Sequence, residues 1–145
     1  MKPTTPFFLL AGLTSTIATP VSMAAAETWT LVNLTRTCDE ADTQCDWTFS
    51  INASPPDDTA VPCDYTVVAS GDTPASQANG GPTTCGAYNL TSGWSGQFGP
   101  DAGFTTLSVV DYARKLIAYA GYTDAQLAKG VTVEPDQSYP VQNLP

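Results

Sequence analysis

Three short extended segments near the middle of the chain constrain its fold more than any other feature. Residues 88–98 place large apolar side chains on one face and polar side chains on the other, which is the period of a half-buried strand. A loop rich in glycine follows at 99–103. Two β-branched runs, 104–110 and 113–119, are separated by two residues, which predicts a hairpin. Three antiparallel strands of this kind are the smallest unit that could organise further strands.

The first 26 residues match a secretory signal peptide. Lys2 precedes an apolar run at 7–13 that is too short to span a bilayer, and small residues lead up to Ala26. We therefore expect cleavage after Ala26 and a secreted, extracellular protein. The exported part, 27–145, is the size of one β domain, whose last residues, 134–145, we expect to be an irregular tail.

The charge of the exported part disfavours several partners. The whole chain has 14 acidic and five basic residues and a formal charge of −9; loss of Lys2 leaves four basic residues and a charge of −10. Such a surface repels phosphate backbones and anionic lipids, so we expect no nucleic-acid partner and no membrane insertion. Histidine, the usual general base near neutral pH, is absent from the sequence.

Four cysteines, Cys38, Cys45, Cys63 and Cys85, lie in the exported part. An even number in a secreted chain predicts two disulfides, for which three pairings exist. We favour Cys38–Cys45 and Cys63–Cys85, because each pair joins sequence neighbours that could flank one hairpin. A zinc site is disfavoured, since there is no Cys-x-x-Cys spacing and no histidine to complete a ligand set.

Further strands precede the central sheet. Residues 46–52 alternate cleanly and place Trp47, Phe49 and Ile51 inside. The first strand, 28–37, changes the parity of its apolar residues midway, which a bulge would reconcile.

The remaining segments complete an all-β pattern. Residues 63–70 alternate as another strand, and 131–133 could form a short one. Thr123 can cap a single helical turn, because Gln126 lies three residues later. Six or seven strands with almost no helix predict a small antiparallel β-barrel or sandwich, stapled by two disulfides.

No catalytic constellation stands out. Serine and cysteine nucleophile systems lack their histidine, and neither Lys115 nor Lys129 shows a serine–lysine pattern. Sugar hydrolysis needs two carboxyl groups about 5–5.5 Å apart in a retaining enzyme, and nothing marks such a pair. The acidic loop 39–42 has no glycine for a calcium-binding turn and is interpreted as a solvated hairpin tip. We therefore expect no enzyme activity, no metal and no cofactor.

Aromatic residues and sequons supply the candidate surface sites. Tyr112 lies in a tight turn, where side chains are usually exposed, and is the candidate contact residue. The sequons at Asn33, Asn52 and Asn89 are candidate glycosylation sites, of which Asn52 is weakened by Pro55. Five other aromatic residues have inward parity and are expected in the core: Trp47, Phe49, Tyr65, Trp94 and Tyr119.

Several of these segments together resemble a known family. They are the Cys38…Cys45 loop, the run Cys63-x-Tyr65-Thr66-Val67, and above all SGWSGQFGP…GFTTLSVVDY…LIAYAGYTD. The chain is similar to small secreted proteins of filamentous fungi, and among them to the hypersensitive-response-inducing proteins, which act as elicitors on plants. The resemblance spans most of residues 28–140 and implies a twisted β-barrel with two disulfides, secretion, and recognition by a host. It carries over no individual functional residue.

Three functions remain open at this point. The first is a secreted, non-enzymatic fungal effector or elicitor that acts by surface recognition, as a monomer, on an unknown host protein or cell-wall glycan. The second is a carbohydrate-binding module for wall glycans, favoured by the aromatic residues and polar loops. The third and weakest is a small glycoside hydrolase that uses two carboxylates.

Overall fold

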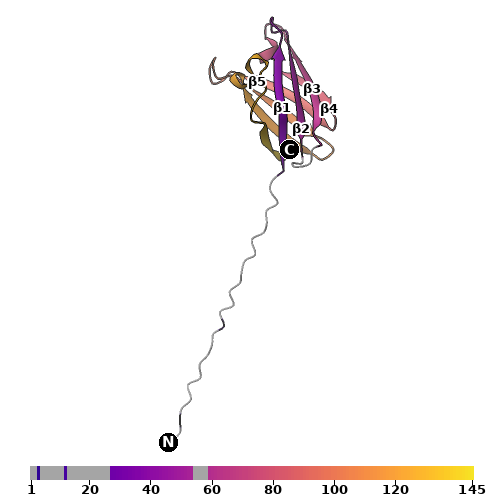
Figure 1. The fold of residues 1–145 in the computed structure, drawn as a ribbon, viewed down its shortest axis with the longest axis vertical. Coiled ribbons are helices and arrows are strands. Elements are labelled where there is room, and N and C mark those ends of the chain that lie inside the picture. Colours follow the sequence, from indigo (N-terminus) through magenta and orange to yellow (C-terminus); the bar gives the residue numbers. More distant parts are fainter. Residues whose placement is uncertain (1–2, 4–11, 13–26, 54–58) are drawn as a thin grey trace.

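Antiparallel strands of the described residues form a single sheet that curls into a nearly closed barrel (Figure 1). The structure is a computed structural model, and it describes residues 3, 12, 27–53 and 59–145. The predicted signal peptide therefore lies outside the described residues, apart from Pro3 and Gly12. The elements are β1 (Thr28–Cys38), β2 (Gln44–Asn52), β3 (Val61–Val68), η1 (Ala75–Gln77), β4 (Gly80–Cys85), β5 (Tyr88–Ser95), β6 (Phe104–Asp111), β7 (Leu116–Thr123), α1 (Asp124–Leu127), η2 (Ala128–Gly130) and β8 (Gln137–Asn143).

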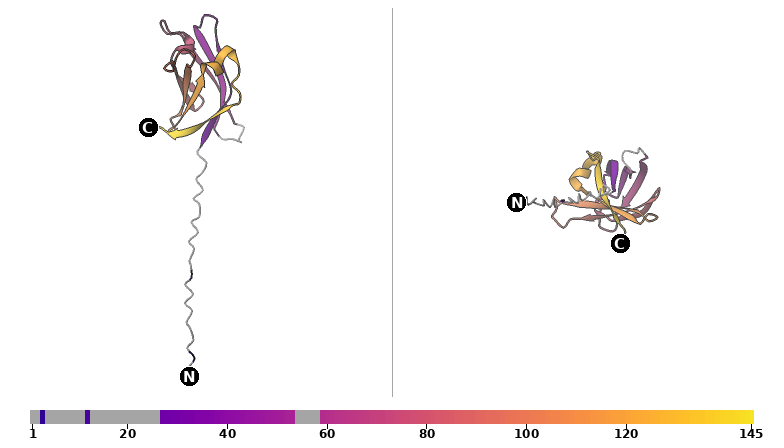
Figure 2. Two further views of the ribbon diagram at one scale, coloured as in Figure 1. Left: turned by 90° about the vertical axis from the view of Figure 1, so that its left-hand side faces the viewer. Right: turned by 90° about the horizontal axis from the view of Figure 1, so that it is seen from below.

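The sheet has the strand order β3-β2-β1-β8-β7-β6-β5-β4, so β3 and β4 are its two edges. Viewed along the long axis, the sheet wraps round on itself (Figure 2). The Cys63–Cys85 disulfide joins the two edges, with 5.5 Å between the Cα atoms. Gly80 permits their close approach, because a Cβ there would collide with Tyr65 and Val67 across the seam. The cross-link therefore protects edges that would otherwise be open to pairing.

The predicted bulge in the first strand is confirmed. Pairing of β1 with β2 shifts between Val32 and Thr35, and Asn33 has a φ of 52°. The extra residue changes which side chains point inward, from Leu31 before the bulge to Leu34 and Arg36 after it. The bulge thereby directs a basic side chain into the barrel.

The core fills the barrel with aromatic and branched side chains. Trp29 meets Tyr88 edge to face, with 5.1 Å between ring centroids. Three of the five predicted core aromatics, Trp47, Phe49 and Tyr65, are buried as expected. The largest fully buried side chains are Trp29, Trp47, Tyr65, Tyr122, Leu31, Leu34, Ile51, Leu90, Leu107 and Leu127.

The other two predicted core aromatics lie elsewhere. Tyr119 is 47% exposed on the outer face of β7, where the small Ala118 and Ala120 point inward instead. Trp94 is only half-buried, at the end of β5. Phe98, expected on the same face, lies beyond that strand and is 70% exposed.

The C-terminal segment differs from the expectation of an irregular tail. It contains β8, which pairs with β1 on one side and β7 on the other and so joins two parts of the sheet. Residues 131–133 form no strand, although the Val133 N–H donates to the Leu34 carbonyl at 2.8 Å. With β8 included, the sheet has eight strands where six or seven were expected.

Both predicted disulfides and the predicted helical turn are present. Cys38–Cys45 closes the β1–β2 hairpin, and Cys63–Cys85 closes the barrel. Thr123 and Gln126 form the reciprocal cap of α1: the Gln126 N–H donates to the Thr123 hydroxyl, and the Thr123 N–H donates to the Gln126 side chain.

Candidate functional site

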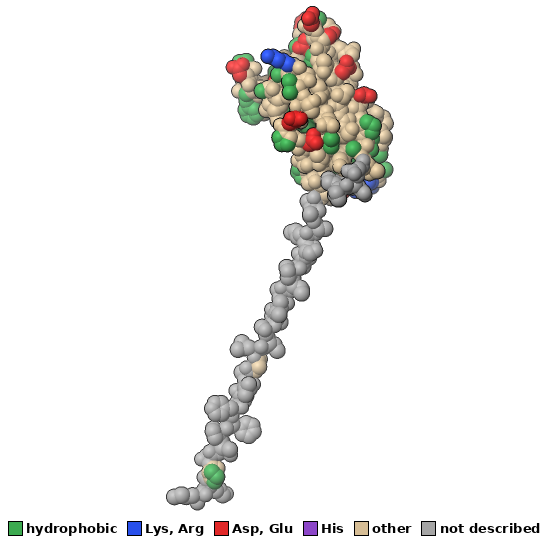
Figure 3. Space-filling view, viewed as in Figure 1, with side chains coloured by type: hydrophobic (Ala, Val, Ile, Leu, Met, Phe, Trp, Pro, Cys, Tyr) green, Lys and Arg blue, Asp and Glu red, His purple; other side chains and the backbone are tan. Residues whose placement is uncertain are grey.

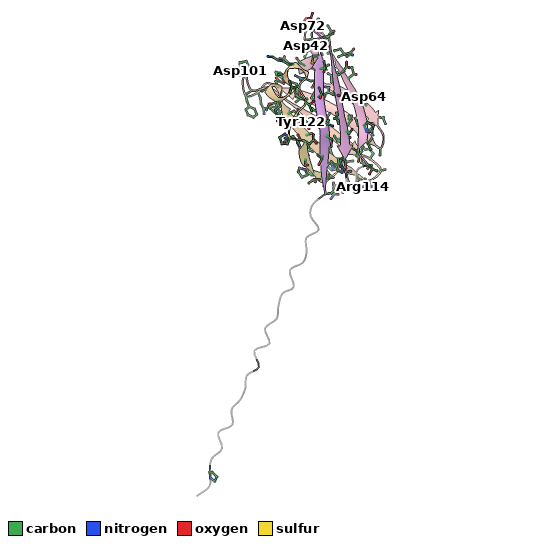
Figure 4. All side chains as sticks on the ribbon, in the orientation of Figure 1. Asp42, Asp64, Asp72, Asp101, Arg114 and Tyr122 are labelled. Carbon is green, nitrogen blue, oxygen red and sulfur yellow. A yellow bond between two sulfur atoms is a disulfide. The ribbon has the colours of Figure 1, made fainter. Side chains whose placement is uncertain are left out.

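One end of the barrel is covered by the β1–β2 hairpin, η1 and the α1–η2 segment, and is here called the mouth. Asp42 and Asp72 lie at this end, and Arg114 lies at the opposite end (Figure 4). Acidic side chains greatly outnumber basic ones on the face shown in Figure 3 and gather near the mouth.

The short helix η1 closes the mouth and is tied to the hairpin by Asp42. The Asp42 carboxylate accepts the Ser76 N–H at 2.8 Å and the Ser76 hydroxyl, and its carbonyl accepts the Ala75 N–H at 2.8 Å. Ala75 and Ala78 are buried beneath this contact. Asp42 therefore holds η1 against the hairpin and is not a solvated residue of the tip. The rest of the acidic hairpin is exposed, as expected from the sequence.

The same hairpin holds a tight cluster of two sulfurs and a carboxylate. Cys38, Asp42 and Cys45 have their potential ligand atoms within 4.8 Å of one another. Both sulfurs belong to one disulfide, so neither is a thiolate that could bind a metal. At the tip, hydrogen bonds from the Thr43 hydroxyl and N–H hold the pKa of Asp39 below its usual value.

A first hollow of about 360 Å³ lies between η1 and the end of β5. Its aromatic wall is Trp94, whose indole N–H donates to both carboxylate oxygens of Asp124, at 3.0 and 3.2 Å. A Cβ at Gly103 would come within 2.9 Å of this ring, and one at Gly96 would also collide with it. The indole is therefore held in one position. The rest of the lining is Ala78 and four polar residues, Ser70, Thr73, Gln77 and Asn79.

A second hollow, of about 370 Å³, lies between β1, η1 and the α1–η2 segment. Arg36 forms its inner wall and is 8% exposed; its guanidinium carbon lies 5.6 Å from the centre of the Trp47 ring. Burial lowers the pKa of Arg36, while the charges of Asp124 and Asp42 raise it; the guanidinium stays charged at neutral pH. The complete lining is Arg36, Thr37, Cys38, Ser76, Leu127, Lys129 and Gly130.

The remaining predicted site residues lie away from these hollows. Tyr112 is 63% exposed in the β6–β7 turn, near Arg114 and the opposite end of the barrel. There Arg114 forms a two-pronged ion pair with Glu27 at 2.9 and 3.0 Å. This hydrogen-bonded partner lowers the pKa of Glu27.

The three sequons have different surroundings. Asn33 is exposed at the bulge, and its backbone N–H donates to Asp136 at 2.9 Å. Asn89 is half-buried in β5 and accepts from the Thr84 hydroxyl at 3.4 Å. Asn52 ends β2, and the rest of its sequon lies partly outside the described residues. Asn33 is the most accessible of the three, and all three stay predictions.

A loop beside the mouth presents an apolar side chain. It carries Asp101 and projects from the barrel (Figure 4). Phe98, at the start of this loop, stacks on Phe104 with 5.9 Å between ring centroids. No described helix is long and apolar enough to serve as a membrane span.

The sequence analysis did not predict that Arg36, Asp42 and Asp124 lie together at the mouth. Arg36 gave one local signal, since it is a basic residue at an inward position two residues after Leu34. Asp42 and Asp124 gave none, because their partners lie more than 25 residues away in the chain.

Comparison with known proteins identifies the family. Residues 30–144 match the family model described as Effector TSP1. A curated protein named Effector TSP1, from Hypocrea virens (strain Gv29-8 / FGSC 10586), is 50% identical over 123 residues, which cover 85% of this chain and 81% of that protein. The chain belongs to the Effector TSP1 family.

Proposed function

We propose that this protein is a secreted fungal effector that acts by binding a host or cell-wall molecule at the barrel mouth, without breaking a bond. Family membership supports the effector role, and the leader-like N-terminus supports secretion. The observation that carries the proposal is the fixed geometry of the mouth. Asp42 ties η1 to a disulfide-closed hairpin, and Asp124 fixes Trp94.

Binding fits this arrangement better than hydrolysis. A surface already held in one geometry loses little conformational freedom when a ligand binds. Two-carboxylate chemistry would need a pair of acids directed at a substrate. The mouth acids closest to Arg36 are instead engaged within the protein, Asp42 with Ser76 and Asp124 with Trp94.

Infiltration of purified protein into leaves of several plant species tests the effector role. We expect defence responses that persist in a variant with the exposed carboxylate Asp64 replaced, D64N, because no carboxylate acts as a catalyst. A lack of response in every species, or measurable turnover of a wall polysaccharide, would contradict the proposal.

A carbohydrate-binding role is the second candidate, and the hollow at Trp94 favours it. An immobilised aromatic ring beside amide and hydroxyl side chains offers both stacking and hydrogen bonds to a sugar. Pull-down with wall polysaccharides tests this role. Trp94→Ala should abolish capture if the mouth binds the glycan, whereas loss in Tyr112→Ala would place binding at the opposite end. Absence of capture by every wall polymer would remove this candidate.

A further inference from the structure

The basic residues of this acidic protein gather in two pairs, one at each end of the barrel. Residues 27–145 contain four basic residues, and two of them, Arg36 and Lys129, line the same hollow. Its lining, as described by the structure, includes no acidic residue. The other two, Arg114 and Lys115, belong to the turn at the opposite end, where Arg114 is bound to Glu27.

The buried Arg36 side chain forms few hydrogen bonds within the protein. A guanidinium has five N–H groups. Among the described residues, the only hydrogen bond of the Arg36 side chain is from Nη1 to the Ser76 carbonyl, at 3.5 Å. Nε is sealed from solvent and has no partner. A ligand cannot reach the sealed Nε, but the terminal Nη1 and Nη2 groups are not among the sealed, unpartnered atoms of the described residues, and an anion in the hollow would accept hydrogen bonds from them.

The neighbouring carboxylates do not fill this role. Asp42 and Asp124 act on Arg36 through their charge, but neither forms an ion pair with it in the described part of the chain. Their oxygens accept hydrogen bonds from Ser76 and Trp94 respectively. Lys129 adds a second, exposed cation at the rim, in a left-handed turn with φ of 61°.

The charge of the whole protein limits which anion fits. A polyanion would be repelled by the acidic surface, whereas one carboxylate can use the local cations without that cost. Ser76 of this hollow and Gln77 of the Trp94 hollow are consecutive residues of η1, so the two hollows flank the same short helix. A sugar that carries one carboxylate matches both, since Trp94 suits a sugar ring and Arg36 an acid.

We propose that the Arg36–Lys129 hollow binds the carboxylate of a single uronic acid carried by an otherwise neutral glycan. This inference rests on the carbohydrate-binding role proposed for the mouth. It assigns the two hollows different tasks: Trp94 and its amide neighbours contact the neutral sugar ring, and Arg36 with Lys129 selects the acid.

Calorimetric titration of the secreted protein tests this assignment. The probes are xylotriose, xylotriose bearing one glucuronic acid, trigalacturonate and triglutamate. We expect the acid-bearing xylotriose to bind about tenfold more tightly than xylotriose and more tightly than either polyanion. Raising the salt concentration from 0.05 to 0.5 M should narrow the difference between the first two probes.

The chain supplies a matched pair of variants. Lys129→Asn should weaken binding of the acid-bearing probe about threefold to tenfold and leave xylotriose unchanged. Lys115→Asn is the control, because Lys115 is also exposed and left-handed, with φ of 55°, but lies at the other end. Arg36→Gln should cause the larger loss, and its thermal unfolding must be measured alongside because the side chain is buried.

The outcomes separate the two proposals. Equal affinity for the acidic and neutral probes, or no difference between the Lys129 and Lys115 variants, overturns the uronate site. If xylotriose binding is then still lost in Trp94→Ala, the carbohydrate-binding role stands without it. Tightest binding of triglutamate would instead assign the hollow to an acidic peptide and overturn the proposal. Failure of every sugar to bind overturns both roles.

Discussion

Removing the disulfide at the barrel seam should destabilise the protein more than removing the disulfide of the hairpin. The chain-entropy model relates the stabilisation to the length of the loop that the cross-link closes. Cys63–Cys85 closes a loop of 22 residues, and Cys38–Cys45 closes one of 7. At 25 °C these lengths correspond to about 3.4 and about 2.4 kcal/mol of unfolding free energy.

The measurement is thermal unfolding of two double variants, Cys63→Ala with Cys85→Ala and Cys38→Ala with Cys45→Ala. For roughly 119 residues, an unfolding entropy of about 2.1 cal/mol/K per residue converts these energies to melting-temperature losses of about 14 °C and about 10 °C. Fluorescence of the buried Trp29 and Trp47 reports the transition.

The seam variant should differ in a second way. The Cys63–Cys85 bond joins edge strands that lie at opposite ends of the hydrogen-bonded strand order, so its loss frees both edges. Amide exchange should therefore rise selectively in β3 and β4. Peptide mapping must show that the other disulfide is intact. Equal stability of the two variants, or a more stable seam variant, would refute the reasoning.

Three further perturbations follow from the described contacts. Asp42→Ala should lower the unfolding free energy by about 1–3 kcal/mol in denaturant titration, because Ser76 loses its charged acceptor. Gly80→Ala should cost about 1–3 kcal/mol in the same assay, because its Cβ collides across the seam. Because Arg114 lowers the pKa of Glu27 below its ordinary value of 4.5, the ion pair stabilises the folded protein fully above pH 4.5, and this stabilisation is lost as the pH falls through the lower folded-state pKa. Arg114→Gln should make the loss of stability at acid pH smaller, by less than about 1 kcal/mol because the pair is exposed. Unchanged stability in Asp42→Ala or Gly80→Ala, or an unchanged pH dependence in Arg114→Gln, would contradict the corresponding argument.

Local patterns were sufficient to predict several of the strands and both cross-links. Clean alternation identified β2, because a strand with one buried face repeats every two residues. The disulfide pairing was predicted from sequence neighbours that could flank one hairpin. That reason holds for Cys38–Cys45, whereas Cys63–Cys85 joins the two edges of the sheet. The capping pattern of Thr123 and Gln126 is also contained in a few consecutive residues.

The error at Tyr119 shows where such patterns fail. A two-residue turn was expected before a strand at 113–119, but the turn occupies Tyr112–Lys115 and β7 begins at Leu116. An error in turn length leaves the inward parity of the next strand undetermined. Size was misleading as well, because the interior takes Ala118 and Ala120 on this strand, while Tyr119 lies on the outer face.

The mouth could not be predicted because its members are far apart in sequence. Asp42 meets Ser76 across 34 residues, and Trp94 meets Asp124 across 30. These contacts exist only once the barrel has brought hairpin, loop and helix to one end. Trp94 was expected in the core because it shares the inward parity of Tyr88 and Leu90. It does share that parity, but it is only half-buried because β5 ends at the next residue, Ser95.

The position of β8 between β1 and β7 determines when the continuous sheet can form during folding. Strands β1–β3 form one run of neighbours and β4–β7 another, and the last strand is the piece inserted between them. A nascent chain that stops before Gln137 therefore holds two meanders that share the Cys63–Cys85 cross-link but no continuous ladder. The continuous sheet therefore cannot form until residues 137–143 are in place between β1 and β7.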